Sequence, residues 1–252
     1  MNLIMKLRNQ PSLIRAYTFL LISLLLGSLW GCDSGENQAE TSQRRKGANA
    51  ENSNTQKPAE QPTTEKIILF YGNSLTAGYG IEPSQAFPAL IGAKLDSAGY
   101  QYKVVNAGLS GETTAGGRSR IGWVLRQPVS IFVLELGGND GLRGIPLTAT
   151  KQNLQAIIDT VKAKSPEAKI VIAGMQIPPN MGPEYTSRFR ELYKELAREN
   201  NLALIPFLLE GVGGIRRLNL PDGIHPTPEG HKVVAKNVWQ VLEPLLEEEA
   251  EG

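Results

Sequence analysis

Short apolar runs recur along the chain from about residue 65 onward, each closed by glycine, asparagine or another polar residue. Uninterrupted apolar runs of this length suit strands that are buried on both faces of a sheet. We therefore predict five strands, at Ile67–Tyr71, Val104–Val105, Ile131–Leu134, Ile170–Ala173 and Leu202–Ile205.

Longer stretches with helical spacing lie between and after these runs. Asn153–Ala163 is an example, because its apolar residues return every three or four positions and so share one face of a helix. Thr227 and Pro228 open the last stretch with a good N-cap and a residue tolerated at the first helical position. The predicted helices are Phe87–Ala98, Asn153–Ala163, Glu184–Asn200 and a last one from Pro228 to about Leu246.

Strands that alternate with helices indicate βαβ units. We expect an α/β fold, with helices on both faces of a mainly parallel, about five-stranded sheet, which makes a three-layer α/β/α sandwich. Ligand sites in such sheets lie beyond the carboxyl ends of the strands. Polar and glycine-rich turns follow the first three predicted strands, at 72–74, 106–108 and 137–140.

The N-terminal part has a different pattern. Basic residues precede a short apolar run, Ala16–Leu26, which is short for a bilayer span and typical of a signal peptide. The run leads to Leu29-Trp30-Gly31-Cys32, which resembles the lipobox of bacterial lipoproteins except at Trp30. We predict a signal peptide over 1–32 and lipidation of Cys32. An uncleaved signal anchor and a secreted protein without lipid remain alternatives.

Residues 33–64 are rich in polar side chains and poor in large apolar ones. Such a stretch cannot bury enough apolar surface to offset the entropy lost on ordering, so we predict a disordered tether. The folded domain would then span 65–247, followed by an acidic tail at 248–252. Acyl chains on Cys32 would hold the protein in the bacterial envelope without spanning the membrane, facing the periplasm or the cell surface.

Composition argues against several classes of ligand and cofactor. The formal net charge of +1 gives no indication of nucleic-acid binding. Two histidines and one cysteine make a zinc site a poor candidate, although a carboxylate-only magnesium or calcium site stays open. Neither a phosphate-binding loop nor a dinucleotide-binding glycine motif follows a strand. We expect no cofactor and no metal; the oligomeric state stays unknown.

Ser74 follows the first strand in a glycine-flanked turn. A serine hydroxyl needs a base before it becomes a good nucleophile, and the local sequence alone favours Ser74 as a cap of the following turn or helix. His225 supplies a candidate base, because Asp222 three residues earlier can bond one ring nitrogen and leave the other free to accept a proton. His231 lies within the last predicted helix, where we expect a structural or solvent-facing role.

Two further residues could stabilise an oxyanion. Gly108 has a backbone N–H that a substrate can approach closely, and Asn139 offers a side-chain amide. Taken alone, the local sequence favours a turn role over a catalytic role for both residues. Ile177 and Met181 follow the fourth strand, where they could line an acyl site or simply connect to the next helix.

Four segments together resemble the GDSL, or SGNH, hydrolase family, most closely its branch of lysophospholipase L1, arylesterase and acyl-CoA thioesterase I enzymes. The segments are Gly72-Asn73-Ser74-Leu75-Thr76, Asn106-Ala107-Gly108 with its continuation to Thr114, Gly137-Gly138-Asn139-Asp140, and Asp222-Gly223-Ile224-His225-Pro226. The resemblance covers Lys66 to Leu246 and implies a flavodoxin-like SGNH hydrolase fold.

The resemblance implies a serine esterase acting on lysophospholipids, acyl esters or aryl esters, with thioester cleavage chemically possible. Ser74 would be the nucleophile, His225 the base and Asp222 its partner. The oxyanion hole would combine the Ser74 and Gly108 N–H groups with the Asn139 side chain. Asn73 departs from the family pattern, which usually has Asp there, and we predict that activity is retained.

Two other functions stay open. A carbohydrate O-acetyl esterase would use the same catalytic residues with a different pocket. A catalytically silent binding lipoprotein would keep the fold without the reaction, although every catalytic position is filled.

Overall fold

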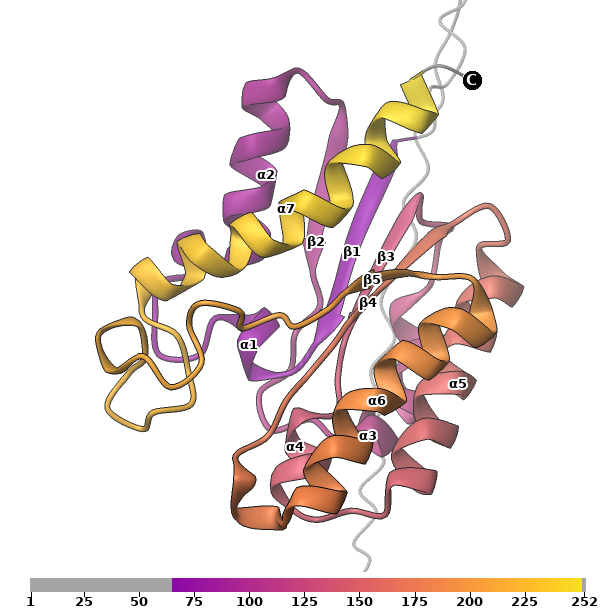
Figure 1. Cartoon of the computed structure of the whole chain (residues 1–252). Coiled ribbons are helices and arrows are strands. Elements are labelled where there is room, and N and C mark those ends of the chain that lie inside the picture. Colours follow the sequence, from indigo (N-terminus) through magenta and orange to yellow (C-terminus); the bar gives the residue numbers. More distant parts are fainter. Residues whose placement is uncertain (1–64, 251–252) are drawn as a thin grey trace, which may run out of the picture. The chain divides into compact units, whose positions relative to one another are not determined.

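The structure, a computed structural model, describes residues 65–250, with side chains up to Leu246. The predicted signal peptide, Cys32 and tether lie outside the described residues, as do the last two residues of the predicted tail. The described part contains a five-stranded sheet in which every neighbouring pair is parallel (Figure 1). Its strands, in spatial order, are β2 (Tyr102–Asn106), β1 (Lys66–Gly72), β3 (Ile131–Glu135), β4 (Lys169–Ala173) and β5 (Ala203–Ile205).

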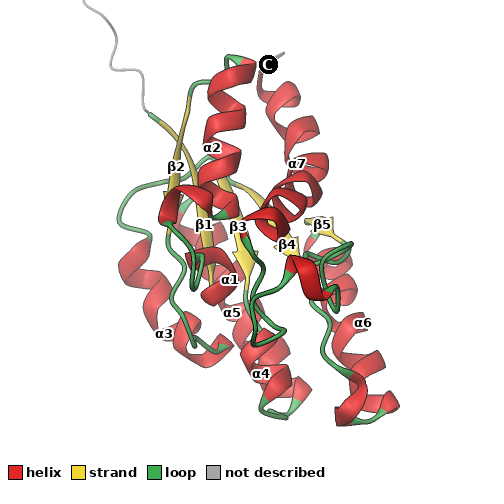
Figure 2. Ribbon diagram, turned by 90° about the vertical axis from the view of Figure 1, so that its left-hand side faces the viewer, coloured by secondary structure: helices red, strands yellow, loops and turns green. Residues whose placement is uncertain are grey.

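Helices cover both faces of the sheet (Figures 1 and 2). On one face α2 (Phe87–Ala98) packs against α7 (Pro228–Ala250). On the other, α5 (Leu147–Lys164) packs between α3 (Thr114–Val124) and α6 (Pro183–Asn200). The helices divide between the two faces because the crossovers are right-handed and the chain changes direction along the sheet. It runs from β1 to β2 toward one edge, and from β2 through β5 toward the other. The predicted three-layer α/β fold is confirmed.

The strands are apolar because both of their faces are covered. Phe70 and Phe132 of neighbouring strands have no exposed surface, and the apolar stripe predicted for Asn153–Ala163 is buried beneath the sheet. The interior closes without an unpaired buried side-chain polar atom among the described residues. The sheet is therefore a rigid base from which the turns at its carboxyl edge project.

Short helices at the turns were not predicted. They are α1 (Ser74–Ala77), α4 (Gly138–Leu142) and the 3₁₀ turns η1 (Pro83–Gln85), η2 (Pro179–Met181) and η3 (Arg216–Leu218). The full helix α3 was also missed, since Gly116 and Gly117 interrupt its pattern. Gly117 is needed there, because a Cβ would overlap Leu136, and its carbonyl accepts a hydrogen bond from Tyr71 Oη at 2.7 Å.

The last helix is longer than predicted. It begins at Pro228 as expected, and the Thr227 side chain accepts a hydrogen bond from the N–H of Gly230 at 3.2 Å. It continues to Ala250 rather than ending near Leu246. Its added residues are glutamates and alanine, which are good helix formers. Within the described residues, no helix combines the length and hydrophobicity that crossing a membrane requires.

Candidate active site

Ser74 lies at the carboxyl end of β1, between β2 and β3, where the direction of travel along the sheet reverses. Ligand sites in doubly wound sheets form at this point. Ser74 is the first residue of α1, and Asn73 caps that helix by accepting a hydrogen bond from the N–H of Leu75 at 2.9 Å. Figure 1 shows α1 following directly after β1 at this edge of the sheet, and Ser74 lines a cavity there.

His225 reaches Ser74 from the far end of the chain. Its Nε2 lies 2.8 Å from Ser74 Oγ, although 151 positions separate the two residues. Its Nδ1 lies 2.7 Å from Asp222 Oδ2. Because an ionised carboxylate only accepts hydrogen bonds, the ring proton belongs on Nδ1, and Nε2 is free to accept the serine proton. The structure thus brings Ser74, His225 and Asp222 together in the order predicted.

The Asp222 carboxylate is fixed by its own turn. Its Oδ1 accepts hydrogen bonds from the N–H groups of Ile224 at 2.9 Å and His225 at 3.0 Å. Desolvation raises the pKa of Asp222, but these hydrogen bonds and the one from the His225 ring outweigh it and hold the pKa at about 2. Asp222 therefore stays ionised throughout the range in which a histidine base works.

Two predicted oxyanion donors lie near the turn that carries Ser74, because Asn139 lines the same cavity and Gly108 packs against α1. Asn139 is oriented by one hydrogen bond, from its Nδ2 to the carbonyl of Glu112 at 3.0 Å, which leaves its second amide hydrogen available. Gly108 packs so closely on α1 that a Cβ would overlap the backbone nitrogen of Ala77. In this structure the Gly108 N–H donates to Asn106 Oδ1 at 3.0 Å, so a substrate oxygen would share this donor or displace Asn106.

An ion pair that the sequence did not reveal holds the segment carrying Gly108. Arg120 Nη2 contacts Glu112 Oε2 at 2.6 Å, and the same nitrogen donates to the Ala107 carbonyl at 2.9 Å. The guanidinium also lies 4.4 Å from the ring centre of Tyr71. Because Ala107 O and Gly108 N belong to one peptide, Arg120 fixes the direction in which the Gly108 N–H points.

A second missed residue, Glu135, ends β3 beneath the nucleophile turn. It is buried, and its carboxylate accepts hydrogen bonds from Asn73 N at 3.0 Å, Asn73 Nδ2 at 2.8 Å, Thr76 N at 3.2 Å and Thr76 Oγ1 at 2.7 Å. Burial raises the pKa of Glu135 to about 7, although these four hydrogen bonds oppose the shift. The sequence could have indicated this role, because Glu135 ends an apolar strand and acidic residues are almost never buried without partners.

A cavity of about 480 Å³ opens beside Ser74 and His225. Apart from the site residues themselves, its walls are mainly apolar and come from the loops after β3, β4 and β5; they include Leu142, Met175, Ile177, Phe207, Leu209 and Ile224. Ile177 therefore lines the cavity as predicted. Met181 does not, because it lies in a separate hollow with Gly144, Leu147 and Tyr185.

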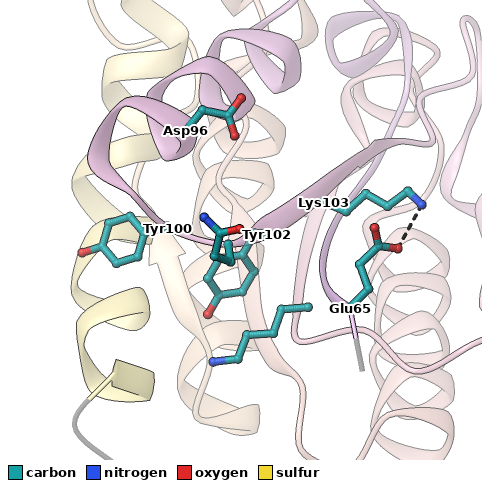
Figure 3. Close-up of a pocket in the computed structure, with 7 residues that line it drawn as sticks. Glu65, Asp96, Tyr100, Tyr102 and Lys103 are labelled. Atoms are coloured by element: carbon teal, nitrogen blue, oxygen red, sulfur yellow. Dashed lines mark hydrogen bonds and ion pairs between the residues drawn. The ribbon is translucent and has the colours of Figure 1, made fainter. Parts of the chain in front are cut away.

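A hollow of about 610 Å³ lies at the opposite edge of the sheet (Figure 3). Figure 3 shows Lys103 paired with Glu65 on one side of Tyr102 and Tyr100 on the other. Lys103 Nζ lies 3.0 Å from Glu65 Oε2. The Lys103–Glu65 pair is exposed and contributes little to stability. The residues that line this hollow include neither a nucleophile beside a base nor a set of oxyanion donors.

His231 has a structural role. It is buried, its Nδ1 accepts a hydrogen bond from the N–H of Phe87 at 3.1 Å, and its ring stacks on that of Phe87. Burial, followed by the charge of His225, lowers the pKa of His231 to about 4. Of the two roles predicted for His231, the structural one is confirmed and the solvent-facing one is wrong.

Comparison with known proteins places this geometry in a family. Residues 70–233 match the GDSL-like Lipase/Acylhydrolase family. The chain belongs to that family. It is a carboxylic ester hydrolase of the GDSL type, as the sequence motifs predicted.

Two relatives of this GDSL hydrolase match most of its described residues. Esterase TesA of Pseudomonas aeruginosa is 41% identical over 187 residues, which cover 74% of this chain and 92% of the relative. Thioesterase 1/protease 1/lysophospholipase L1 of Escherichia coli K12 is 38% identical over 180 residues, covering 71% and 84%. The catalytic motifs thus lie within a sequence match that extends across the whole fold.

A solved structure agrees with the same fold. The psychrotrophic esterase EstA from Pseudoalteromonas sp., in a form inhibited by monoethylphosphonate, superposes with a TM-score of 0.68 at 28% sequence identity. The match covers 73% of this chain and 100% of that one. The GDSL hydrolase therefore shares the architecture of an experimentally determined esterase.

Proposed function

We propose that this hydrolase cleaves carboxylic esters through an acyl-enzyme on Ser74. The observation that carries the proposal is the chain of two short contacts from Ser74 Oγ to His225 and from His225 to Asp222. It is the arrangement that general-base activation of a serine requires. The inhibition of the Pseudoalteromonas relative by a phosphonate supports it, because phosphonates are electrophiles that activated nucleophiles attack.

The reaction would proceed in two steps. His225 Nε2 takes the proton of Ser74 as Oγ bonds to the ester carbonyl carbon, and it returns that proton to the alcohol as the ester C–O bond breaks. Water then enters, gives a proton to His225 and bonds to the acyl carbon. His225 returns that proton to Ser74 Oγ as the bond between Oγ and the acyl carbon breaks, which releases the acid and restores Ser74. Asp222 stabilises the imidazolium that forms in each step and holds the ring in the correct tautomer.

Donors around Ser74 would hold the negative oxygen of each tetrahedral intermediate. The N–H of Ser74 is available because the first amides of a helix have no acceptor within it. The second hydrogen of Asn139 Nδ2 is also available, and the Gly108 N–H joins when the carbonyl oxygen replaces Asn106 Oδ1 as its acceptor. Each such donor typically contributes about 3 kcal/mol to lowering the barrier.

The apolar cavity favours an ester with an extended acyl or aryl group, such as a lysophospholipid or an aryl ester. Its apolar walls would stabilise a hydrocarbon chain by about 0.8 kcal/mol for each methylene that is buried. A carbohydrate O-acetyl esterase would need polar or aromatic surfaces for the sugar. Apart from the site residues, the described cavity offers Phe207 as its one Phe, Tyr or Trp side chain, with Gln176 and Asn219 as its polar side chains. The lipid or aryl ester is therefore the better supported substrate class.

A fluorophosphonate label and a nitrophenyl ester series test the two parts of this proposal. The intact protein should be labelled, and Ser74→Ala should abolish both labelling and hydrolysis without loss of folding. Turnover should rise from acetate to longer acyl chains. Activity confined to the acetate would favour the O-acetyl esterase, and an intact protein that resists the label would favour a silent binding protein.

We also propose that Cys32 carries a lipid anchor, as its sequence context predicts. In a bacterial host, Cys32→Ser should move the enzyme from the membrane fraction to the soluble fraction, and incorporation of labelled fatty acid should disappear. Equal membrane association of the two proteins would contradict the anchor.

A further inference from the structure

Beneath Ser74 lies a closed set of hydrogen bonds that the reaction itself does not use. Glu135 faces Gly72 across the β1–β3 pair, and its side chain rises under the turn that carries the nucleophile. Gly72 makes room for it, because a Cβ at that position would overlap both the Glu135 carboxylate and Thr76 Oγ1. The carboxylate therefore lies directly against the turn.

The two oxygens of Glu135 have different partners. Oε2 accepts from the N–H of Asn73, from the N–H of Thr76 and from Thr76 Oγ1. Oε1 accepts from Asn73 Nδ2. One buried carboxylate thus binds the residues directly before and two positions after Ser74, and so fixes the turn from which the Ser74 side chain projects.

The orientation of the Asn73 amide is fixed from both ends. Its Oδ1 accepts from the N–H of Leu75, which caps α1, so its Nδ2 has to face Glu135 Oε1. An aspartate at position 73 could serve the cap equally well but would place a second carboxylate against Glu135. Asn73 is therefore the donor that matches an acceptor below it, and the two residues form one unit.

We propose that Glu135 is a positioning residue for the nucleophile, and that Asn73 and Glu135 are matched so that each determines which side chain the other position accepts. This inference rests on the proposed role of Ser74. It also explains the asparagine at position 73. The neutral amide donates the fourth hydrogen bond to Glu135, whereas an aspartate would need a proton shared between the two carboxylates.

Replacement of Glu135 by glutamine tests whether the hydrogen-bonding groups of Asn73 and Glu135 are matched. In whichever way the new amide at position 135 turns, its NH₂ group meets donors: Asn73 Nδ2 on one side, or the two backbone N–H groups on the other. If Asn73 turns instead, its own NH₂ faces the N–H of Leu75. An unpaired buried donor is costly, so Glu135→Gln should slow labelling of Ser74 by about tenfold or more.

The same change should be harmless when residue 73 is aspartate. In Asn73→Asp/Glu135→Gln, the glutamine NH₂ donates to the new carboxylate at position 73, and its oxygen accepts the three hydrogen bonds that Oε2 accepts now. That carboxylate still accepts the N–H of Leu75 and so keeps the cap. Adding Glu135→Gln to the Asn73→Asp variant should therefore change the labelling rate and kcat by less than about threefold.

The experiment is a double-variant cycle with fluorophosphonate labelling rates, kcat and KM for a nitrophenyl ester, and thermal unfolding. Asp140→Asn is the matched control, because Asp140 is also a buried carboxylate at this edge but bonds Thr114 rather than the nucleophile turn. Its effect should be the same in both backgrounds. A loss in kcat at constant KM, rescued by Asn73→Asp, is the expected result.

Equal losses from Glu135→Gln in both backgrounds, or no loss in either, would overturn the matching of the two residues. Should Glu135→Gln prove too unstable to purify, a folded and labelled double variant would still support the proposal, and a double variant that is no better would overturn it. An intact protein that never labels would instead count against Ser74 as nucleophile.

Discussion

At the scale of single residues, the site depends on the direction of a few protons. The Ser74 proton points to His225 only while the His225 ring proton points to Asp222, and that in turn requires an acceptor-only carboxylate at position 222. Three hydrogen bonds and a pKa of about 2 keep Asp222 in that state. With the wrong tautomer, His225 could not take the Ser74 proton, and the other acceptor of that hydroxyl, the amide oxygen of Asn73 at 3.4 Å, is no base.

Asp222→Asn tests this directly. The asparagine oxygen can still accept the N–H groups of Ile224 and His225, but its NH₂ group would face His225 Nδ1 and favour the other tautomer. We expect kcat to fall by roughly 10²- to 10⁴-fold with little change in KM or thermal stability. A steady-state comparison on one nitrophenyl ester is sufficient, and a variant within about threefold of the parent kcat would contradict the role of Asp222.

At the scale of elements, the sequence indicated the strands and the long helices because each has a repeating apolar pattern. It did not indicate α3, whose two glycines interrupt that pattern although one of them is required where the helix meets Leu136. Ser74 was found because it occupies a short turn after a strand, and Asp222 and His225 because they lie three residues apart in one motif before the last helix. Glu135 and Arg120 were not found, because their roles depend on side chains brought together by the fold.

The Arg120–Glu112 pair joins two elements, since Arg120 belongs to α3 and Glu112 to the segment before it. Arg120→Met would leave Glu112 buried without its partner, and we expect a loss of about 3–5 kcal/mol in the free energy of unfolding. Turnover should also fall, because the Ala107–Gly108 peptide loses its fixed direction.

Urea unfolding measures the first effect of Arg120→Met, and kcat measured well below the midpoint of unfolding measures the second. Arg120→Met/Glu112→Gln is the control, because the neutral glutamine is far less costly to leave unpaired. It should recover much of the stability but not the turnover. Full recovery of both would show that the ion pair serves stability alone.

At the scale of the whole molecule, two buried groups have pKa values shifted in opposite directions, so they affect the pH dependence of stability in opposite ways. His231 has a pKa near 4 in the folded state against about 6.5 when exposed, so the unfolded chain binds its proton first and stability falls as the pH drops through that window. Glu135 has a raised pKa of about 7, so it stabilises the fold at low pH and this contribution is lost as the pH rises. Between about pH 4.5 and 6.5 the two contributions oppose each other.

A comparison of His231→Gln with the parent separates the two groups, because Glu135 contributes equally to both proteins. Glutamine can still accept the N–H of Phe87 but does not titrate. On acidification from pH 7 to pH 4, the parent should lose up to about 3 kcal/mol more unfolding free energy than the variant. Denaturant titrations at several pH values measure the difference, and parallel curves would contradict a neutral buried His231.

The parallel sheet has one more consequence. Since all five strands run in the same direction, β1 starts at the edge where Glu65 and Lys103 meet and ends at the edge that carries Ser74. A linker or solid support joined just before Glu65 would thus be attached about 20 Å from the catalytic turn, given the rise per residue in a strand. The domain should accordingly keep its full turnover when it is immobilised or displayed through that end.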